Sequence, residues 1–215
     1  MNKYMTILTA VILPVILCGC GEGFYGEGEK TAGSYYVNPE KGPTSIRQAA
    51  IFEFENLSNH PNISSDVTKE LYTRLQKNAP FGTYMINQND RRWNSCMLDP
   101  YGSYTAEQLN SIEKTLDCEA VLIGTITEYQ PYPHMTIGIR LKLVDLRDGE
   151  LLWAYENSWD CTDKNTQDQM VRYFKNHTRY GNSDIQQELI TISPLNFFKF
   201  VAHEASGTIT ADKKS

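Results

Sequence analysis

The chain has 215 residues, 40% of them hydrophobic, and a formal net charge of −6 at pH 7. This length suits one domain with a targeting segment and a tail, and the hydrophobic fraction is that of an ordinary globular fold. The negative charge gives no electrostatic basis for binding nucleic acid, so no such partner is expected.

Residues 1–19 have the pattern of a bacterial lipoprotein signal peptide. Lys3 supplies a positive start, and residues 5–17 form an apolar stretch that is too short to span a bilayer. The motif Leu17-Cys18-Gly19-Cys20 then has the form of a lipobox. It resembles lipoprotein precursors, which are cleaved before the last cysteine of the motif. The alternative is an uncleaved signal anchor.

That resemblance implies that Cys20 carries acyl chains and anchors the mature protein to a membrane. Several chains anchor stably, because each buried methylene contributes about 0.8 kcal/mol. Cys18 is the weaker candidate, since bulky Leu17 would sit at its cleavage position. Gly21 stands where an aspartate would be the common signal for retention in the inner membrane. The family rule therefore favours the outer membrane, with the domain facing the periplasm.

Residues 20–46 are rich in glycine and show no period of 2 or 3.6, which predicts a flexible tether. The alternative is that Tyr35-Tyr36-Val37 adds an edge strand. A domain is expected over residues 47–206, followed by a polar tail over residues 207–215.

The first half of that domain reads as strand, helix and strand. An apolar run predicts a strand over residues 48–55, and another predicts a strand over 81–86. Between them, apolar side chains recur every four residues in a helix that starts at an Asn62 or Ser64 cap and ends near Lys77.

Residues 87–104 form the longest irregular segment, and loops of this length are often functional. The alternative is a disordered insertion. We expect a partner or ligand surface from this segment together with the loop after residue 130. Its candidate residues are Arg91, Arg92, Trp93, Tyr101 and Tyr132, with Tyr104 and Tyr129 as further aromatic candidates.

The second half of the domain is organised around a meander of three strands within residues 120–159. A continuous apolar run, a strict alternation over residues 135–143 and the turn signal Asp148-Gly149 define it. A capping box that starts at Thr105 predicts a helix before the meander. Further helices are expected over 166–177, 185–192 and from Pro194 onward. The order β-α-β-α-β-β-β, followed by helices, predicts an α/β (α+β) fold. It has a mixed sheet of about five strands covered by crossover and C-terminal helices.

This order, behind a lipobox, resembles a superfamily of envelope lipoproteins that includes CsgG of curli secretion, PelC of exopolysaccharide export and LpoB, the penicillin-binding-protein activator. Three stretches carry the resemblance: residues 50–56, residues 117–126, and residues 143–153 with their turn and Trp153. The chain lacks the long amphipathic stretches that would make the barrel of CsgG. The resemblance therefore implies the shared domain and not a pore.

No residue pattern predicts catalysis, a metal or a cofactor. The four histidines lie on different elements without ligand spacing. Glu53 and Glu55 fall on one face of the first strand, a spacing that could suit acid–base chemistry, but a polar strand face explains them better. The chain is therefore not expected to be an enzyme.

Three cysteines remain for a disulfide in an oxidising compartment. Parallel crossovers would place Cys96 and Cys161 at one end of the sheet, with Cys118 about 30 Å away at the other. A bridge needs α-carbons within about 7 Å, so Cys96–Cys161 is the only compatible pair. The alternative is that all three remain thiols.

These features favour a non-catalytic accessory lipoprotein of the outer membrane, acting in secretion, polysaccharide export or cell-wall synthesis. Its expected partners are the membrane, through the lipid anchor, and an envelope protein, which could be a second copy of the chain. The alternative is a module that binds glycan or peptidoglycan through its aromatic loop residues.

Overall fold

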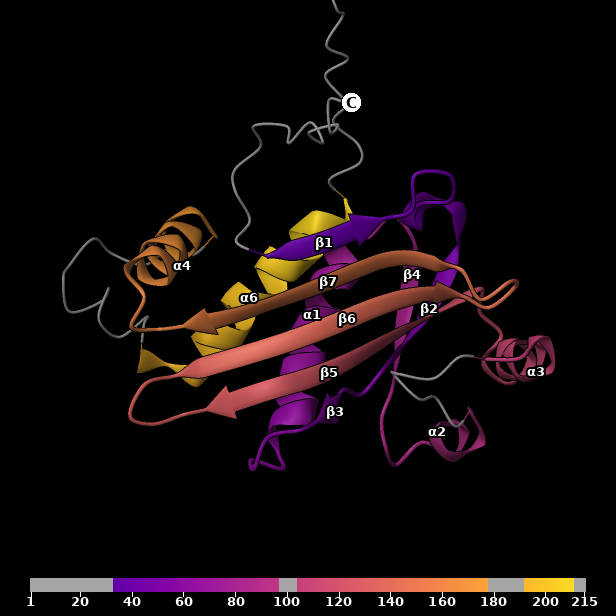
Figure 1. Ribbon diagram of the computed structural model, residues 1–215, viewed down its shortest axis with the longest axis horizontal. Coiled ribbons are helices and arrows are strands. Elements are labelled where there is room, and N and C mark those ends of the chain that lie inside the picture. The colour runs from indigo at the N-terminus through magenta and orange to yellow at the C-terminus, as the bar shows by residue number, and fades with distance from the viewer. Residues whose placement is uncertain (1–32, 97–103, 178–191, 211–215) are drawn as a thin grey trace, which may run out of the picture. The chain divides into compact units, whose positions relative to one another are not determined.

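The computed structural model describes residues 33–96, 104–177 and 192–210 (Figure 1). Within these ranges, seven strands form one mixed sheet in the order β1-β7-β6-β5-β2-β4, with β3 pairing beside β5. The elements are β1 (Ser34–Val37), η1 (Pro43–Ser45), β2 (Gln48–Phe52), β3 (Glu55–Asn56), α1 (Ile63–Asn78), β4 (Gly82–Ile86), α2 (Arg91–Cys96), α3 (Ala106–Leu116), β5 (Ala120–Gln130), β6 (Thr136–Asp145), β7 (Leu151–Asp160), α4 (Lys164–His177) and α6 (Pro194–Ile209). The predicted fold class is confirmed, and β1 and β3 are added to the five strands expected.

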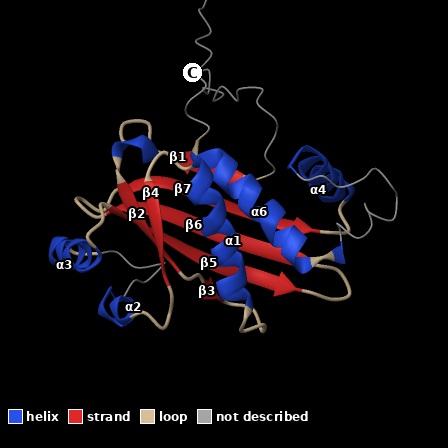
Figure 2. Cartoon of the chain, turned by 180° about the vertical axis from the view of Figure 1, so that it is seen from behind, coloured by secondary structure: helices blue, strands red, loops and turns tan. Residues whose placement is uncertain are grey.

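The three strands joined by helices run parallel, as predicted. β2 lies between β4 and β5, and Ala50 pairs with Tyr84 on one side and Val121 on the other. The connection through α1 packs on one face of the sheet, with Leu71 in its core, whereas α3 packs on the other face through Leu109 (Figures 1 and 2). The two connections therefore leave the region of β2 on opposite faces.

The meander of β5, β6 and β7 is antiparallel throughout. Ile137, Ile139, Leu141 and Leu143 of β6 are buried, while Arg140 between them is partly exposed. Gly149 closes the β6–β7 turn with a φ of 78°, a left-handed conformation that glycine adopts without steric cost. The alternation of apolar and polar residues along β6 is why the meander was predictable from its sequence.

The larger core lies between the meander and the helices α1 and α6, which cross one face of the sheet side by side (Figure 2). Trp153 is 0% exposed at its centre and stacks on Tyr155. Its Nε1–H donates to Thr208 Oγ1 at 3.1 Å. The expectation of a polar tail from residue 207 is therefore wrong at its start, because α6 continues to Ile209 and buries both Thr208 and Ile209.

The interpretation of residues 20–46 as a tether is also wrong for its C-terminal part. β1 pairs antiparallel with β7, placing Tyr35 opposite Tyr155. Beyond β1, Lys41 Nζ lies 2.7 Å from a carboxylate oxygen of the fully buried Asp145. β1 therefore belongs to the folded domain, and residues 20–32 lie outside the described residues.

Gly124 marks a close approach between β5 and the segment that links β2 to β3. A Cβ atom at this position would lie 2.3 Å from Cδ1 of Phe54, whose ring is fully buried. We expect Gly124→Ala to lower the free energy of unfolding by about 1–3 kcal/mol through overpacking. Urea unfolding followed by circular dichroism measures this change.

The matched control is Gly207→Ala in α6, where a Cβ atom would meet nothing within 4 Å. It should raise the free energy of unfolding by about 0.5–1 kcal/mol, because alanine favours a helix over glycine. A Gly124→Ala protein as stable as the unmodified one would contradict the packing of Phe54 against β5.

Candidate binding cleft

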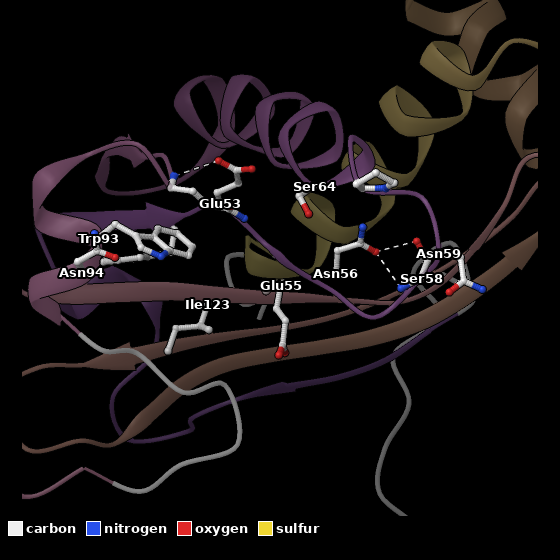
Figure 3. Close-up of a pocket in the computed structure, with 13 residues that line it drawn as sticks. Glu53, Glu55, Asn56, Ser58, Asn59, Ser64, Trp93, Asn94 and Ile123 are labelled. Atoms are coloured by element: carbon white, nitrogen blue, oxygen red, sulfur yellow. Dashed lines mark hydrogen bonds between the residues drawn. The ribbon is translucent and has the colours of Figure 1, made fainter.

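A cleft of about 840 Å³ opens beyond the carboxyl ends of β2 and β4 (Figure 3). Ligands of open α/β sheets bind at such a position, because the loops diverge where connections leave on opposite faces. The cleft is formed by the chain after β2, the loop into α1, the chain after β4, α2 and the middle of β5. Its lining residues are Phe52, Glu53, Glu55, Asn56, Ser58, Asn59, Pro61, Ser64, Gln88, Trp93, Asn94, Ile123 and Gly124.

One wall is the loop from β3 into α1, and its own hydrogen bonds hold its shape. Asn56 Nδ2 donates to the His60 carbonyl oxygen at 2.7 Å, and Asn56 Oδ1 accepts from the Ser58 backbone N–H at 2.9 Å. The loop reaches α1 without a side-chain cap from Asn62. Asn56 and Ser58 therefore shape this wall.

The opposite wall is α2, a short helix in the segment that the sequence predicted to be irregular. Asp90 accepts hydrogen bonds from the Arg92 side chain and backbone, which lower the pKa of Asp90 to about 2. The Trp93 ring packs against Phe52 with 5.4 Å between ring centroids. These contacts hold six residues in a helix that has no apolar stripe of its own.

Of the predicted surface residues, the structure brings Trp93 into the cleft. Arg92 is engaged by Asp90 and lies over the Tyr84 ring, 5.5 Å from its centroid. Arg91 is exposed and does not line the cleft. The arginine pair therefore does not act as one unit.

The aromatic platform expected from the sequence is not assembled among the described residues. Tyr132 is 82% exposed in the β5–β6 connection and is not part of the cleft lining. Tyr104 packs with the core beneath α3, whereas Tyr129 contacts His60 and Phe198 on the other face of the sheet. Tyr101 lies outside the described residues.

Glu53 and Glu55 both line the cleft, but their carboxylates point away from each other (Figure 3). Glu53 Oε2 accepts from the Gln88 backbone N–H at 3.1 Å, and Glu55 Oε2 accepts from Thr125 Oγ1 at 3.3 Å. The expectation that they share one face of a strand is wrong, because β2 ends at Phe52 and β3 begins at Glu55, so Glu53 belongs to neither strand. They do not form an acid–base pair.

Cys96, Cys118 and Cys161 are free thiols, as the alternative expected, and a Cys96–Cys161 bridge is not formed. Cys96 belongs to the core beneath α2 and α3, whereas Cys161 packs against the core on the opposite face of the sheet. Their strands, β4 and β7, lie far apart in the strand order. Burial raises the pKa of Cys96 and Cys118, and that of Cys161 to about 12, which makes all three poor nucleophiles.

Two histidines that are distant in sequence meet where α4 packs on α6. The rings of His177 and His203 lie 4.8 Å apart, and Tyr173 stacks on His203. Arg74 of α1 places Nη2 2.7 Å from His203 Nδ1, so this nitrogen must accept and the ring is neutral. The described residues hold no group of three side chains suited to a metal ion.

Burial, with Arg74 and His177 nearby, lowers the pKa of His203 to about 4. The unfolded chain binds this proton near pH 6.5, so protonation favours unfolding and stability falls as pH drops from about 6.5 to about 4. We expect a loss on the order of 2–3 kcal/mol across this window, read from urea midpoints at each pH.

The variant His203→Gln should flatten that dependence, because glutamine can still accept from Arg74 but does not titrate. His134→Gln, at an exposed position, is the matched control and should keep the full dependence. A His203→Gln protein with an unaltered profile above pH 4.5 would assign the effect to other groups.

Sequence reasoning missed the carboxamide side chains of the cleft, Asn59, Gln88 and Asn94. The available signal was positional: these residues follow the first two helix-connected strands, whose parallel carboxyl ends meet at one edge of the sheet.

Among the described helices, none combines the length and the apolar character needed to cross a membrane.

Neither a protein-family model nor a curated protein matches the chain. Solved structures similar to it include PelC from Paraburkholderia phytofirmans, a dodecamer, at 12% identity and a TM-score of 0.41 over 60% of this chain and 80% of that one. The C-terminal domain of LpoB from Salmonella enterica is 15% identical, with a TM-score of 0.41 over 57% and 87%. Lipoprotein GNA1162 from Neisseria meningitidis is 19% identical, with a TM-score of 0.41 over 60% and 96%. At these values the similarity does not bear on function.

Proposed function

We propose that the chain is a lipid-anchored accessory protein of the bacterial outer membrane, whose folded domain binds a partner in the periplasm. The observation that carries this proposal is the lipobox ending at Cys20, followed by a glycine-rich segment and then by a domain with a preformed cleft. A tether of this kind would let the domain search the space around its anchor while staying on the membrane.

A non-catalytic role is supported by how the cleft is built. Its two carboxylates diverge, and each already holds a neighbouring N–H or hydroxyl. The three buried or partly buried thiols have raised pKa values, so they suit packing and not nucleophilic chemistry. We therefore assign no catalytic residue and no cofactor.

The sequence resemblance to envelope lipoproteins supports a role in secretion, polysaccharide export or cell-wall synthesis. The partner in this proposal is an envelope protein, and a second copy of the chain would also satisfy it. Such an accessory protein acts through its location. The lipid anchor holds it at one membrane, and the folded domain selects the partner that it contacts.

Site-specific crosslinking in intact cells tests the proposal. The photo-crosslinking amino acid p-benzoylphenylalanine is placed at position 94, in the cleft, and at position 110, an exposed site on α3, as the control. An envelope protein joined at position 94 and not at position 110 is the expected result. Equal products at both positions, or only cytosolic products, would contradict it.

A further inference from the structure

We propose that the cleft beyond β2 and β4 binds an oligosaccharide that carries no acidic group. This inference rests on the proposed placement of the domain in the cell envelope, where such chains are present. The volume of about 840 Å³ falls in the range of pockets that enclose small ligands, and the cleft joins a hydrophobic wall to many polar side chains.

The uncharged polar groups divide into those that build the cleft and those that remain available. Asn56 and Ser58 bond to each other and to the loop backbone. The side chains of Asn59, Gln88 and Asn94 are exposed and make no hydrogen bond with other described residues. A carboxamide offers donors and an acceptor together, which matches the hydroxyl groups of a sugar, each both donor and acceptor.

Trp93 supplies the flat apolar surface that a sugar ring needs. The ring is half-buried, and Phe52 supports it at a tilt of 42°. One face of a pyranose presents C–H groups that pack on an aromatic ring, while its hydroxyls project from the rim toward polar neighbours. In Figure 3, Trp93 and Asn94 stand together at one end of the cleft, with Ser58 and Asn59 at the other.

Charge decides which sugars fit. The described residues that line the cleft include no lysine, arginine or histidine, and Glu53 and Glu55 contribute two negative charges. Each carboxylate uses Oε2 within the protein and has Oε1 left to accept from a ligand hydroxyl. Such charge-assisted bonds are strong, whereas an acidic sugar would be repelled.

Tryptophan fluorescence of the full mature protein, in a detergent without a sugar headgroup, tests this inference. Trp153 and Trp159 are 0% and 2% exposed, so a ligand in the cleft should perturb Trp93. The probes are three neutral trisaccharides, tri-N-acetylchitotriose, cellotriose and maltotriose, with trigalacturonic acid as the acidic comparison. A saturable change with at least one neutral probe, and none with the acid at equal concentration, is expected.

Variants locate the binding. Trp93→Ala should weaken the affinity for the neutral sugar tenfold or more, because it removes the aromatic residue that anchors the ring. Asn94→Ala should weaken this affinity severalfold. Saturation-transfer NMR of the sugar measures both changes. Asn110→Ala changes the same side chain on exposed α3 and should bind like the unmodified protein. If Trp93→Ala melts early, Asn59→Ala and Asn94→Ala decide, because both positions are exposed.

Binding of none of the neutral probes at millimolar concentration would overturn the inference, as would equal binding of the acid or unchanged affinity in Asn94→Ala. These failures are separate from that of the proposed function. If an envelope protein crosslinks to position 94 but no sugar binds, the proposed accessory role would stand and the sugar-binding inference would be rejected.

Discussion

The Cys20→Ser protein is expected to lose all acyl label in cells grown with an alkyne palmitate. Cys20 is the cysteine of the lipobox, and its sulfur and new amino group are the expected attachment points. Serine keeps the size of the side chain but offers no thiol. The loss should be complete, because serine offers no thiol for acyl attachment and the amino group is freed only by cleavage before Cys20. In-gel fluorescence after coupling the alkyne to a dye measures it.

The matched control is Cys18→Ser, two residues earlier in the same motif. It should keep the full label, because Leu17 disfavours cleavage before residue 18. Label that persists in Cys20→Ser and disappears in Cys18→Ser would move the attachment site. Label that persists in both would refute lipidation at the lipobox.

Trp153→Ala is expected to cost about 3–5 kcal/mol of stability, the range for truncating a buried tryptophan. The side chain is fully buried between β7 and α6, and its removal also leaves Thr208 without the indole donor. For a domain of this size, the loss corresponds to a melting temperature lower by about 6–20 °C. Thermal unfolding followed by circular dichroism gives the result.

Two variants bracket that effect. Tyr132→Ala, at a side chain 82% exposed, should change the melting temperature little. Trp93→Ala should fall between the two, because Trp93 is half-buried against Phe52. The sequence alone placed Trp93 in an irregular loop, where its removal would have cost almost nothing. A Trp153→Ala protein as stable as the Tyr132 variant would disprove the described core.

The elements that the sequence predicted well are those whose burial is regular. From Ile139 to Asp145, β6 alternates between buried and partly exposed residues, and α1 buries Val67, Leu71 and Leu75 at a spacing of four. The capping box at Thr105 is present, with the Thr105 and Gln108 side chains each bonding the other's backbone. In these segments local preference and tertiary packing agree, so the sequence pattern predicts the element that forms.

The segments that were missed, or expected only as an alternative, owe their structure to distant partners. β1, the alternative edge strand over residues 35–37, has three exposed residues and is held by pairing with β7. α2 depends on Asp90 and on the contact of Trp93 with Phe52. The cleft itself collects side chains from five separate segments, so it could not be seen before the strand order was known.

The Cys96–Cys161 prediction shows where strand direction alone is insufficient. The directions were correct, since β2, β4 and β5 are parallel and β6 runs against them. The lateral order was not available from the sequence, and it places β4 and β7 apart. Two residues at the same end of a sheet can therefore still lie too far apart for a bridge.

Mass spectrometry of the N-terminal peptide, from protein extracted from isolated outer membranes, tests the proposed lipid anchor. We predict a mature chain that begins at Cys20 and carries acyl chains on its sulfur and its amino group. A chain in those membranes that retains residues 1–19, or that begins at an unmodified residue, would contradict it.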